Sequence, residues 1–487
     1  GTPEGFDAIM VLRALAQSGG APVLHIARDD KRMAAMARAL AFFDPTVPIL
    51  MFPGWDCLPY DRVSPNPEIS AARMATLAAL AGGLSGAFVV LTTLNAATQY
   101  LPPRDLLRAS AFAATVGGHI DEGALKDFLV RMGFSQTPTV TEPGDYAVRG
   151  GIIDVWPPGE SGPVRLDLFG DILDGARRFD PATQRTTEKL ERVELAPVSE
   201  VVLDEAAITR FRQNYRIEFG AAGTDDPLYE AVSAGRKHQG VEHWLPFFHD
   251  GLETLFDYLP QARITLDDQT GPQRLARWET ISDQYDTRKT ALTQKGRLDT
   301  VYKPVPPGLL YLDDAAWTKA VAGHRVVQFA PIPAAPGPGI IDAGGRVGRN
   351  FAPERQNESL SLFGALADHV QALRKDGAVI IASWSEGARE RLHGLLQDQG
   401  LSDAKLVADA RGLGPKGSLN LVVWPLEEGF TGGGLAVISE QDVLGDRLIR
   451  PKRKTKRAEN YLTEAQSLSP GDLVVHVDHG VGRYKGL

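Results

Sequence analysis

The sequence predicts a multidomain α/β protein. Helical and strand-like patterns alternate through the first 110 residues, and this alternation is typical of βαβ units on a parallel sheet. The same alternation returns at residues 351–446, after a segment rich in proline and glycine. A chain of 487 residues is long enough for about three domains, each with a core of its own.

The bulk composition fits a soluble globular protein. Hydrophobic residues make up 43% of the chain and charged residues 23%, and the net charge is −9. An acidic chain is not expected to bind nucleic acid nonspecifically over its whole surface, so any contact with nucleic acid should be local. Cys57 is the only cysteine, which excludes an intrachain disulfide and favours the reducing cytoplasm. No apolar run reaches the ~18 residues of a membrane span, so we expect no membrane contact.

The chain has features of a fragment. It lacks an initiator methionine and starts inside a turn, and it ends in the strand-like sequence VVHVDHGVGRYKGL. A lone hairpin is only marginally stable in water. We therefore expect that further residues precede Gly1 and follow Leu487 in the whole protein.

Residues 1–110 form the first part of the predicted α/β domain. The apolar run at 87–91 favours a strand that is covered on both faces. The predicted strands and helices alternate in this order: a helix near 6–18, a strand at 21–27, a helix at 30–43, a strand at 47–53, a helix at 69–82, a strand at 86–93 and a helical start at 94–101.

A change of rhythm marks an inserted α+β domain at residues 111–197. One helical pattern is followed by short strand-like segments, which turn pairs such as Pro-Gly and Gly-Asp separate. The α/β pattern then resumes at 198–329, with helices after Asp204 and the strand ARITLDD. We expect this strand to join the sheet of residues 1–110, although the inserted domain separates them in sequence.

The rest of the chain divides at two linkers. Residues 330–350 are dense in proline and glycine and predict the first linker, before a second α/β domain at 351–446. That domain carries the strand-like segments GAVIIAS, AKLVAD, LNLVVWP and GLAVISE. A basic linker at 447–467 precedes the start of a truncated β domain at 468–487.

The opening residues GTPEGFDAIMVLRAL place a glycine-bearing turn before a helix, as a phosphate-binding loop does. A working loop needs a Lys for the phosphate charge and a hydroxyl for magnesium directly after its last glycine. Gly5 fits as that glycine, but Phe6 and Asp7 follow it, and a carboxylate there would repel a triphosphate. The sequence therefore predicts a plain helix N-terminus, with Thr2 or Glu4 near its cap, in place of a nucleotide site.

A candidate for the second half of a nucleotide site lies at the end of the strand ARITLDD. Asp267 and Asp268 are the pattern expected of a magnesium ligand and its neighbour. Acidic pairs at strand ends are also common in solvated loops. With Phe6 and Asp7 at the opposing loop, the pair has no bound phosphate to act on, so we interpret the scaffold as a degenerate nucleotide site.

Several segments together resemble one protein family. They are GVEHWLPFFHDGLETLFDYLP, ITLDD, PGDYAVRGGIIDVWP, RLDLFGDILDGARRFDPATQRT and VVHVDHGVGRYKGL. This set is similar to the N-terminal portion of the bacterial transcription-repair coupling factors (Mfd), in consistent order along the chain. Residues 1 to about 330 also resemble the excinuclease subunit UvrB. The stretch LPYDRVSPNPEISAARM departs from UvrB, because it leaves no room for the long β-hairpin that UvrB inserts into DNA.

The resemblance implies a fold and a partner for each part. It implies a degenerate RecA-like, UvrB-like domain in two parts, an inserted UvrA-binding domain, a second α/β domain, and the start of a Tudor-like domain that binds the RNA polymerase β subunit. The motor domains that use ATP, Mg and DNA would lie beyond this chain. We therefore expect no cofactor and no catalysis in this region.

The UvrA-contacting residues of the family map onto Arg149, Arg165 and Phe169. In a strand, Arg165, Asp167 and Phe169 alternate onto one face, and an exposed Arg beside an exposed aromatic is typical of an interface anchor. The competing interpretation places Phe169 in a core and the arginines at a solvated edge.

Two polar clusters near the end of the chain invite other functions. A basic run could contact DNA phosphates, although a solvated linker is the simpler interpretation. Its members are Arg450, Lys452, Arg453, Lys454, Lys456 and Arg457. His476, Asp478 and His479 collect metal-ligand types, but strand alternation points them to opposite faces, so we expect no metal site.

Three functions remain open from the sequence. The first is an adaptor that recruits UvrA to a stalled polymerase. The second is a nucleotide-dependent DNA repair ATPase or helicase domain that uses Asp267 and Asp268. The third, compatible with the first, is a module that folds back on its own motor and inhibits it.

Overall fold

The computed structural model describes residues 1–110, 112–220, 226–293, 302–357, 359–445, 473–476 and 480–483. The chain divides into two compact units, residues 1–445 and 446–487. In the second unit, β20 (Leu473–His476) and β21 (Gly480–Arg483) form an antiparallel hairpin. Within the described ranges, no helix has both the length and the apolar composition needed to cross a membrane.

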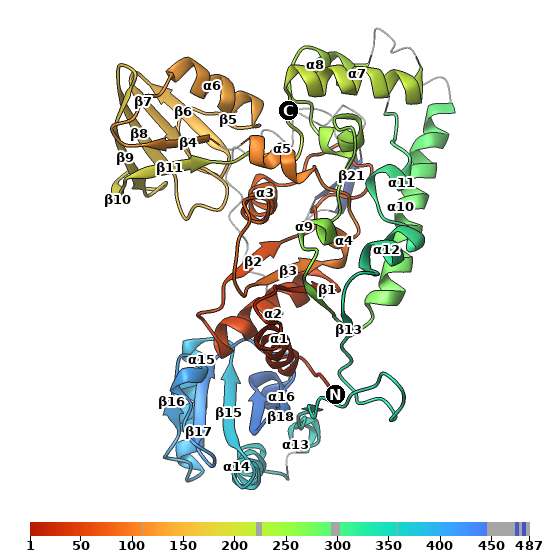
Figure 1. The fold of residues 1–487 in the computed structure, drawn as a ribbon. Coiled ribbons are helices and arrows are strands. Elements are labelled where there is room, and N and C mark those ends of the chain that lie inside the picture. The colour runs from red at the N-terminus through yellow and green to blue at the C-terminus, as the bar shows by residue number, and fades with distance from the viewer. Residues whose placement is uncertain are drawn as a thin grey trace. The chain divides into compact units, whose positions relative to one another are not determined.

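The first sheet is parallel and brings together segments that are far apart in sequence (Figure 1). In β1, Val23 lies opposite Val89 of β3 on one side and Arg263 of β12 on the other. The prediction that ARITLDD joins the sheet of residues 1–110 is therefore confirmed. Its strands, in spatial order, are β13 (Val326–Gln328), β12 (Arg263–Leu266), β1 (Val23–Ala27), β3 (Val89–Thr93) and β2 (Ile49–Phe52).

Helices cover both faces of this sheet. On one face, Met74 and Leu77 share a core with Phe256 and Trp317. The helices that contribute to this core are α3 (Pro67–Ala81), α4 (Leu94–Ala97), α5 (Arg104–Ala109), α9 (Leu255–Tyr258) and α12 (Asp314–Val321). The other face packs against α1 (Phe6–Ala16) and α2 (Asp30–Phe43). Between β2 and α3 the chain forms no strand, as expected for a chain without the UvrB hairpin.

The inserted domain pairs α6 (Glu122–Arg131) with a six-stranded sheet. Its ends meet, because β4 (Phe112–Thr115) pairs antiparallel with β11 (Arg192–Leu195), so the chain enters and leaves at one place. The strands of the main sheet, in spatial order, are β10 (Thr186–Leu190), β9 (Ile172–Phe179), β8 (Val164–Phe169), β7 (Ile152–Val155), β6 (Asp145–Arg149) and β5 (Ser135–Gln136).

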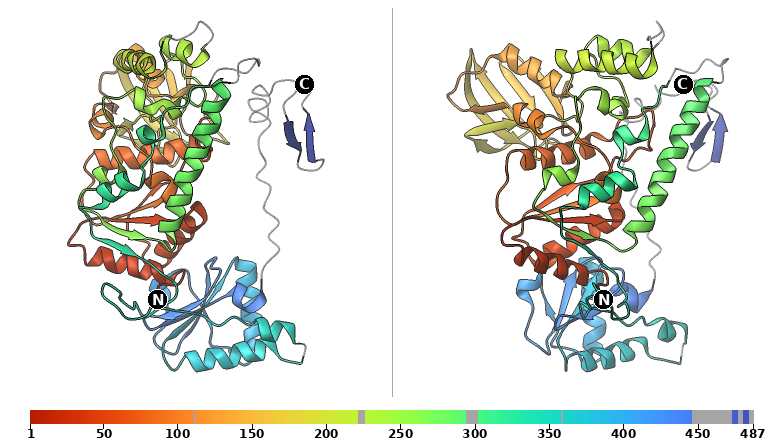
Figure 2. Two further views of the ribbon diagram at one scale, coloured as in Figure 1. Left: turned by 90° about the vertical axis from the view of Figure 1, so that its right-hand side faces the viewer. Right: turned by 45° about the vertical axis from the view of Figure 1, so that its right-hand side comes forward.

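A helical part with an aromatic core follows the inserted domain. Asp204 caps α7 (Glu205–Phe219), where the sequence predicted that helices resume. The core contains Phe211, Tyr215 and Phe248, with Tyr60 from the first part of the chain. The other helices of this part are α8 (Pro227–Ser233), the 3₁₀ helix η1 (Val241–Phe247) and α11 (Pro307–Leu310). Figure 2 shows the long helix α10 (Thr270–Thr293) running from the first sheet towards this part.

The second α/β region has a six-stranded sheet. Its strands, in spatial order, are β14 (Arg346–Val347), β18 (Phe430–Gly432), β19 (Leu435–Ser439), β15 (Ala378–Ser383), β17 (Leu419–Val423) and β16 (Lys405–Leu406). Its helices are α13 (Ala352–Gln356), α14 (Leu362–Leu373), α15 (Glu386–Asp398), the 3₁₀ helix η2 (Ala410–Gly412) and α16 (Glu440–Leu444). The end of the predicted linker forms a strand in the structure. Strand β14 pairs with β18, because the edge of this sheet offers backbone hydrogen-bonding groups.

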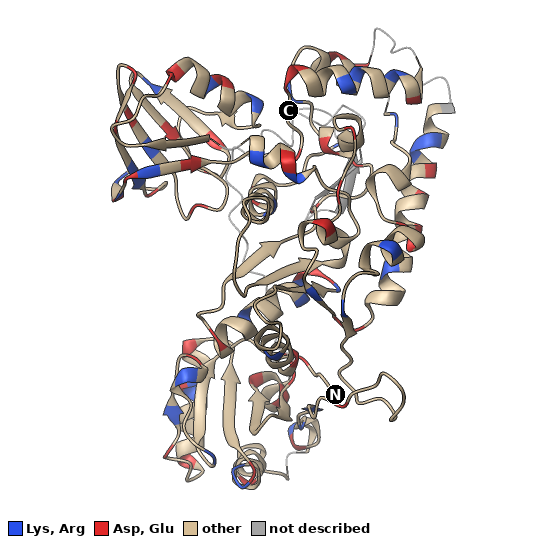
Figure 3. Ribbon diagram, viewed as in Figure 1, with Lys and Arg blue, Asp and Glu red and all other residues tan. Residues whose placement is uncertain are grey.

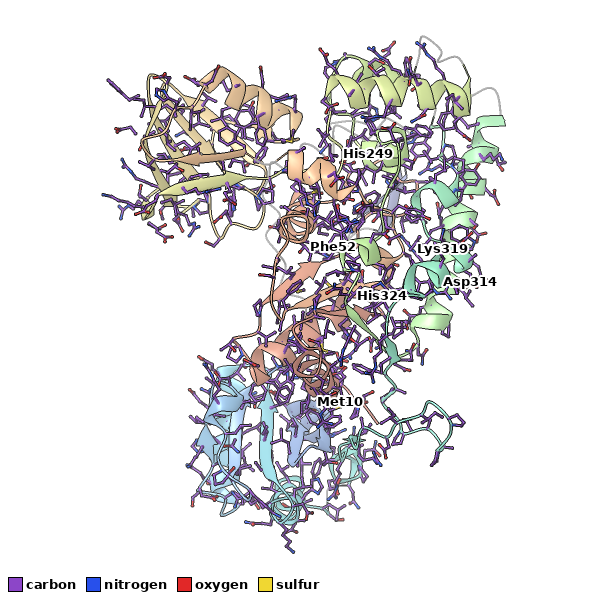
Figure 4. All side chains as sticks on the ribbon, viewed as in Figure 1. Met10, Phe52, His249, Asp314, Lys319 and His324 are labelled. Atoms are coloured by element: carbon purple, nitrogen blue, oxygen red, sulfur yellow. The ribbon has the colours of Figure 1, made fainter. Side chains whose placement is uncertain are left out.

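The first sheet and the second, mixed sheet share one hydrophobic core, which the sequence did not predict. Buried residues of α1 and α2, such as Val11 and Leu40, lie in the same cluster as Val89 of the first sheet and Ile380 of the second. Figure 1 shows α1 and α2 between the two sheets, and Met10 of α1, labelled in Figure 4, packs against the shared core. The predicted linker thus separates two segments in sequence whose cores are continuous.

Candidate functional site

The opening loop is closed by its own carboxylate. Gly5 has φ +85 and precedes α1, and no side chain caps the helix at that position. Asp7 Oδ1 instead accepts the backbone N–H groups of Gly5 (3.0 Å) and Ala8 (2.8 Å). These are the kind of donors that a phosphate would use at a helix N-terminus. The expected cap by Thr2 or Glu4 is wrong, since Thr2 bonds Ala330 and Glu4 pairs with Arg32.

Arg32 lies at the centre of the predicted nucleotide site. Its guanidinium contacts Glu4 (2.9 Å), Asp7 (2.5 Å) and Asp267 (3.2 Å). The site is built where α1 and α2 begin and β12 ends, at the carboxyl edge of the first sheet. The Arg32 side chain is 8% exposed, so a cation from the chain fills this space.

The sequence brought Asp7 and Asp267 together correctly but missed Arg32. The ion pairs of this cluster run through Asp267, while Asp268 donates its backbone N–H to Asp267 Oδ1 (2.9 Å). One signal was available in the sequence. Arg32 stands in the first turn of a helix that follows β1, so its side chain starts at the same sheet edge as the end of β12.

Burial and Arg32 set the protonation of this cluster. Burial raises the pKa of Asp7 to about 7, although the Arg32 charge acts in the opposite direction. Burial also raises the pKa of Glu4. For Asp267, the charges of Arg32 and His25 and its hydrogen bonds outweigh burial, and its pKa is lowered. The cluster therefore holds its own cation and competes for a proton near neutral pH, which is unfavourable for a triphosphate.

Phe6 packs between the opening loop and the second sheet. It is completely buried, and its ring centroid lies 5.8 Å from that of Phe430 in β18. A Cβ added at Gly432 would lie 2.7 Å from Cε2 of Phe6. Phe6 stands where a phosphate-binding loop has its lysine, and it makes an apolar contact with the second sheet.

The outer face of the inserted sheet carries an exposed apolar strip, which consists of Ile152, Phe169 and Ile172. Phe169 is 81% exposed and lies opposite Ile172 across the β8–β9 turn. Ile152 of β7 lies opposite Asp167 on the same face. The opposite face packs on α6 through residues such as Leu166. Phe169 is therefore a surface residue, and the interpretation that placed it in a core is wrong.

The two predicted arginines have different environments. Arg149 is exposed, and its guanidinium donates to Pro138 O (2.7 Å) and Thr139 Oγ1 (3.2 Å). Within the described residues, Arg149 forms no ion pair. Arg165 binds the buried Asp154 through two hydrogen bonds of 2.7 and 2.8 Å, and it lies over the Phe179 ring at 4.7 Å. The guanidinium of Arg165 is therefore already bound to a carboxylate within the domain.

The remaining candidates give no further site. Among the described residues, no group of three or more His, Cys, Asp and Glu side chains could hold a metal ion. Asp478 and His479 lie outside the described residues, as does the basic run of Arg450, Lys452, Arg453, Lys454, Lys456 and Arg457. Figure 3 shows basic and acidic residues interspersed along α10 and the inserted sheet.

Cys57 has a histidine neighbour that the sequence did not indicate. His243 Nε2 lies 3.9 Å from its sulfur. Burial raises the pKa of the thiol to about 12 and lowers the pKa of His243 to about 4. Both shifts disfavour a thiolate–imidazolium pair, so the geometry gives no nucleophile.

Comparison with protein families identifies three parts of the chain. Residues 112–201 match the UvrB interaction domain, residues 373–443 match the MFD, D3 domain, and residues 468–487 match the CarD-like/TRCF RID domain. The fold and these matches define a multidomain α/β protein that carries a UvrB interaction domain.

Curated relatives match the chain over nearly its whole length. It is 30% identical to the transcription-repair-coupling factor of Escherichia coli (strain K12), covering 100% of this chain and 42% of that protein. The factor of Haemophilus influenzae is 29% identical, and the match covers 99% of this chain and 41% of that protein. The factor of Myxococcus xanthus is 30% identical, and the match covers 98% of this chain and 41% of that protein. The predicted resemblance is confirmed: this chain is similar to transcription-repair-coupling factors over nearly its whole length, and it spans about 40% of theirs.

Proposed function

We propose that this region is the adaptor part of a transcription-repair coupling factor, which recruits UvrA to a stalled RNA polymerase. The observation that carries the proposal is a match to the UvrB interaction domain on which Phe169 is 81% exposed. A large aromatic side chain at the surface of a folded domain favours a protein interface.

The apolar strip has the chemistry of an interface centre. Ile152 and Ile172 are each 37% exposed on the same face as Phe169. Ile172 lies opposite Phe169, and Ile152 lies opposite Asp167. Arg149, which lies opposite Ile152, adds a positive charge at the margin. An apolar centre with an arginine at its rim is a common arrangement of binding hot spots. The partner surface should therefore offer an apolar pocket beside a carboxylate.

Two further partners belong to the proposal. The match of residues 468–487 to the CarD-like/TRCF RID domain supports binding to RNA polymerase, through its β subunit as the resemblance implies. The basic run at 450–457 remains a candidate for DNA phosphate contacts in the whole protein.

We further propose that this region has no ATPase activity of its own. Asp7 and Arg32 already satisfy the groups that a nucleotide phosphate would need, and Phe6 replaces the catalytic Lys. ATP and Mg chemistry would belong to motor domains elsewhere in the protein. The alternative ATPase that uses Asp267 requires an open loop, and the Arg32 ion pairs oppose it.

UvrA binding tests the proposal with a matched pair of variants. Phe169→Ala should weaken UvrA binding by about 1–3 kcal/mol, because a hot-spot side chain is lost. Ile217→Ala is the control, since Ile217 of α7 is also 81% exposed but lies outside the inserted domain. Binding can be measured by biolayer interferometry with purified UvrA. If wild type fails to bind UvrA, or if both variants bind as wild type does, the proposal is wrong.

A further inference from the structure

The degenerate nucleotide loop is also a contact surface for the second sheet. A Cβ added at Gly5 would lie 2.7 Å from Cε1 of Phe430 and 3.2 Å from Cη2 of Trp424. A Cβ added at Gly345 would overlap the Phe6 ring. Glycines of the first loop and of the second α/β region thus permit close approach from both sides. Phe6 is enclosed in a socket formed by Phe430, Gly345 and Gly432.

Helix α2 extends this contact. The Phe42 ring stacks on Trp424 with centroids 4.7 Å apart and an interplanar angle of 18°. Phe43 meets the same indole edge-on at 5.5 Å. At the margin, Lys31 Nζ lies 2.6 Å from Glu427 Oε1. The contact therefore has an aromatic centre and a charged rim.

The second sheet needs α1 and α2 to bury one of its faces. Its far face packs on α14 and α15 through Leu366 and Leu392. Its near face presents Ile380, Val422 and Val437, which are all buried in the cluster that contains α1 and α2. A parallel sheet is apolar on both faces, and an uncovered apolar face is unstable in water. The second α/β region therefore completes its core with helices from the start of the chain.

We propose that the former nucleotide loop now serves as an internal docking site. It holds the second α/β region permanently, so that the first and second sheets unfold as one cooperative body. The linker at 330–350 is then a surface connection between parts of one core and does not act as a hinge. This inference is independent of UvrA binding.

The competing account treats the second α/β region as a domain that moves on its linker. Independent domains usually meet at modest, partly polar interfaces, and relative motion is then expected. Here the contact includes completely buried side chains, among them Phe6, Phe430 and Val422. Separation would expose both apolar faces at once.

Hydrogen exchange in increasing urea, read by mass spectrometry on the full chain, tests the proposal. Amides of β1 and β3 report the first sheet, and those of β15 and β17 report the second. Leu392→Ala removes a side chain from the far face, away from α1 and α2. We expect one common urea midpoint in wild type, and an equal fall of both midpoints in Leu392→Ala. Two separate midpoints, or a fall confined to β15 and β17, would overturn the proposal.

A glycine pair tests the socket itself. Gly345→Ala places a methyl group against the Phe6 ring and the Gly1 carbonyl oxygen. Gly337→Ala, in the same segment, meets the flexible end of Ile340 at 3.4 Å and the Ala335 carbonyl oxygen at 3.9 Å. Neither residue has a φ that disfavours alanine. Gly345→Ala should lower the midpoints of both sheets equally, and Gly337→Ala should leave them as in wild type. Loss of protection in only one sheet would contradict the docking role. If Gly345→Ala does not fold, Phe430→Leu makes the same comparison with a smaller change.

Discussion

At the residue scale, Arg32 decides what the opening loop can do. Motif spacing identified Phe6 and Asp7, which follow Gly5, as departures from a phosphate-binding loop. It could not identify the side chain that fills the vacated position, since Arg32 comes from the next helix and reaches the loop through the fold. A buried guanidinium with three carboxylate partners is held in one geometry, and it leaves the loop without a free cationic group.

Asp7 should give stability an unusual dependence on pH. Its folded pKa of about 7 lies above the unfolded value of 3.8, so the folded state binds more protons between these values. The contribution of Asp7 to the free energy of unfolding therefore falls as pH rises from about 4 to about 7. The slope is about 1.4 kcal/mol per pH unit for one fully titrating group. Asp7→Asn should remove it, as measured by urea unfolding at a series of pH values.

Asp180→Asn is the control for this slope. Hydrogen bonds from the backbone and side chain of Thr183 lower the pKa of Asp180, so it stays ionised across the same window. This variant should keep the wild-type pH dependence. An Asp7→Asn protein with the wild-type slope would show that Asp7 is already ionised at pH 5.

Arg165 should matter for folding. Its side chain is 21% exposed, but Asp154 beneath it is 2% exposed and depends on the guanidinium. Arg165→Ala leaves a buried carboxylate unpaired, which should cost about 3 kcal/mol of unfolding free energy. Phe169→Ala on the same strand should change it by about 0.5 kcal/mol or less. Urea denaturation distinguishes the two variants, and equal stabilities would contradict this role.

At the element scale, periodicity identified most helices and strands of the α/β parts. Long amphipathic helices such as α2 and fully buried strands such as β15 have clear hydrophobic patterns in the sequence. Asp29, a residue type that favours helix N-caps, caps α2. Short edge elements were missed. Strand β14 has two residues, and its pairing with β18 comes from the neighbouring sheet edge, which local sequence does not encode.

The loop and its helix should resist reconstruction as an ATPase. Phe6→Lys together with Asp7→Thr restores two residues of the motif, but Arg32 would still pair with Asp267 and Phe430 would still face the loop. We expect no phosphate release from ATP. A bound ligand would stabilise the fold, so we also expect that Mg·ATP does not raise the melting temperature. Measurable hydrolysis by this double variant would show that the loop can reopen.

At the scale of the whole molecule, the described part of residues 1–445 contains several large cores, and one of them joins two sheets. The inserted domain keeps its own core and presents its apolar strip away from that core. A fixed body with an exposed recognition surface suits an adaptor. Buried histidines in different parts of this body also link its stability to pH.

Acid should destabilise the molecule through three buried histidines. Burial lowers the pKa values of His25, His243 and His249 from 6.5 to about 4. The unfolded chain therefore binds more protons between these values, and the free energy of unfolding falls as pH drops through this window. Asp7 and other buried carboxyl groups with raised pKa values, such as Glu4, act in the opposite direction, so the net slope is smaller than that of three histidines alone. Urea unfolding between pH 4.5 and 7 measures the slope, and a pH-independent midpoint would contradict this account.

The sequence by itself determined the order of the domains, the family and the loss of the phosphate-binding motif. These features depend on local periodicity and on residue identity at fixed spacing, as with Phe6 after Gly5. Alternation also put Arg165, Asp167 and Phe169 on one face of their strand, but only the structure showed that Phe169 is exposed.

The tertiary structure alone decided three things. It brought Arg32 to Asp7 and Asp267, engaged Arg165 with Asp154, and joined the two sheets across α1 and α2. Each depends on contacts between segments far apart in the chain, which local periodicity does not specify. The physical reason is that burial, charge pairing and close packing are properties of the assembled core.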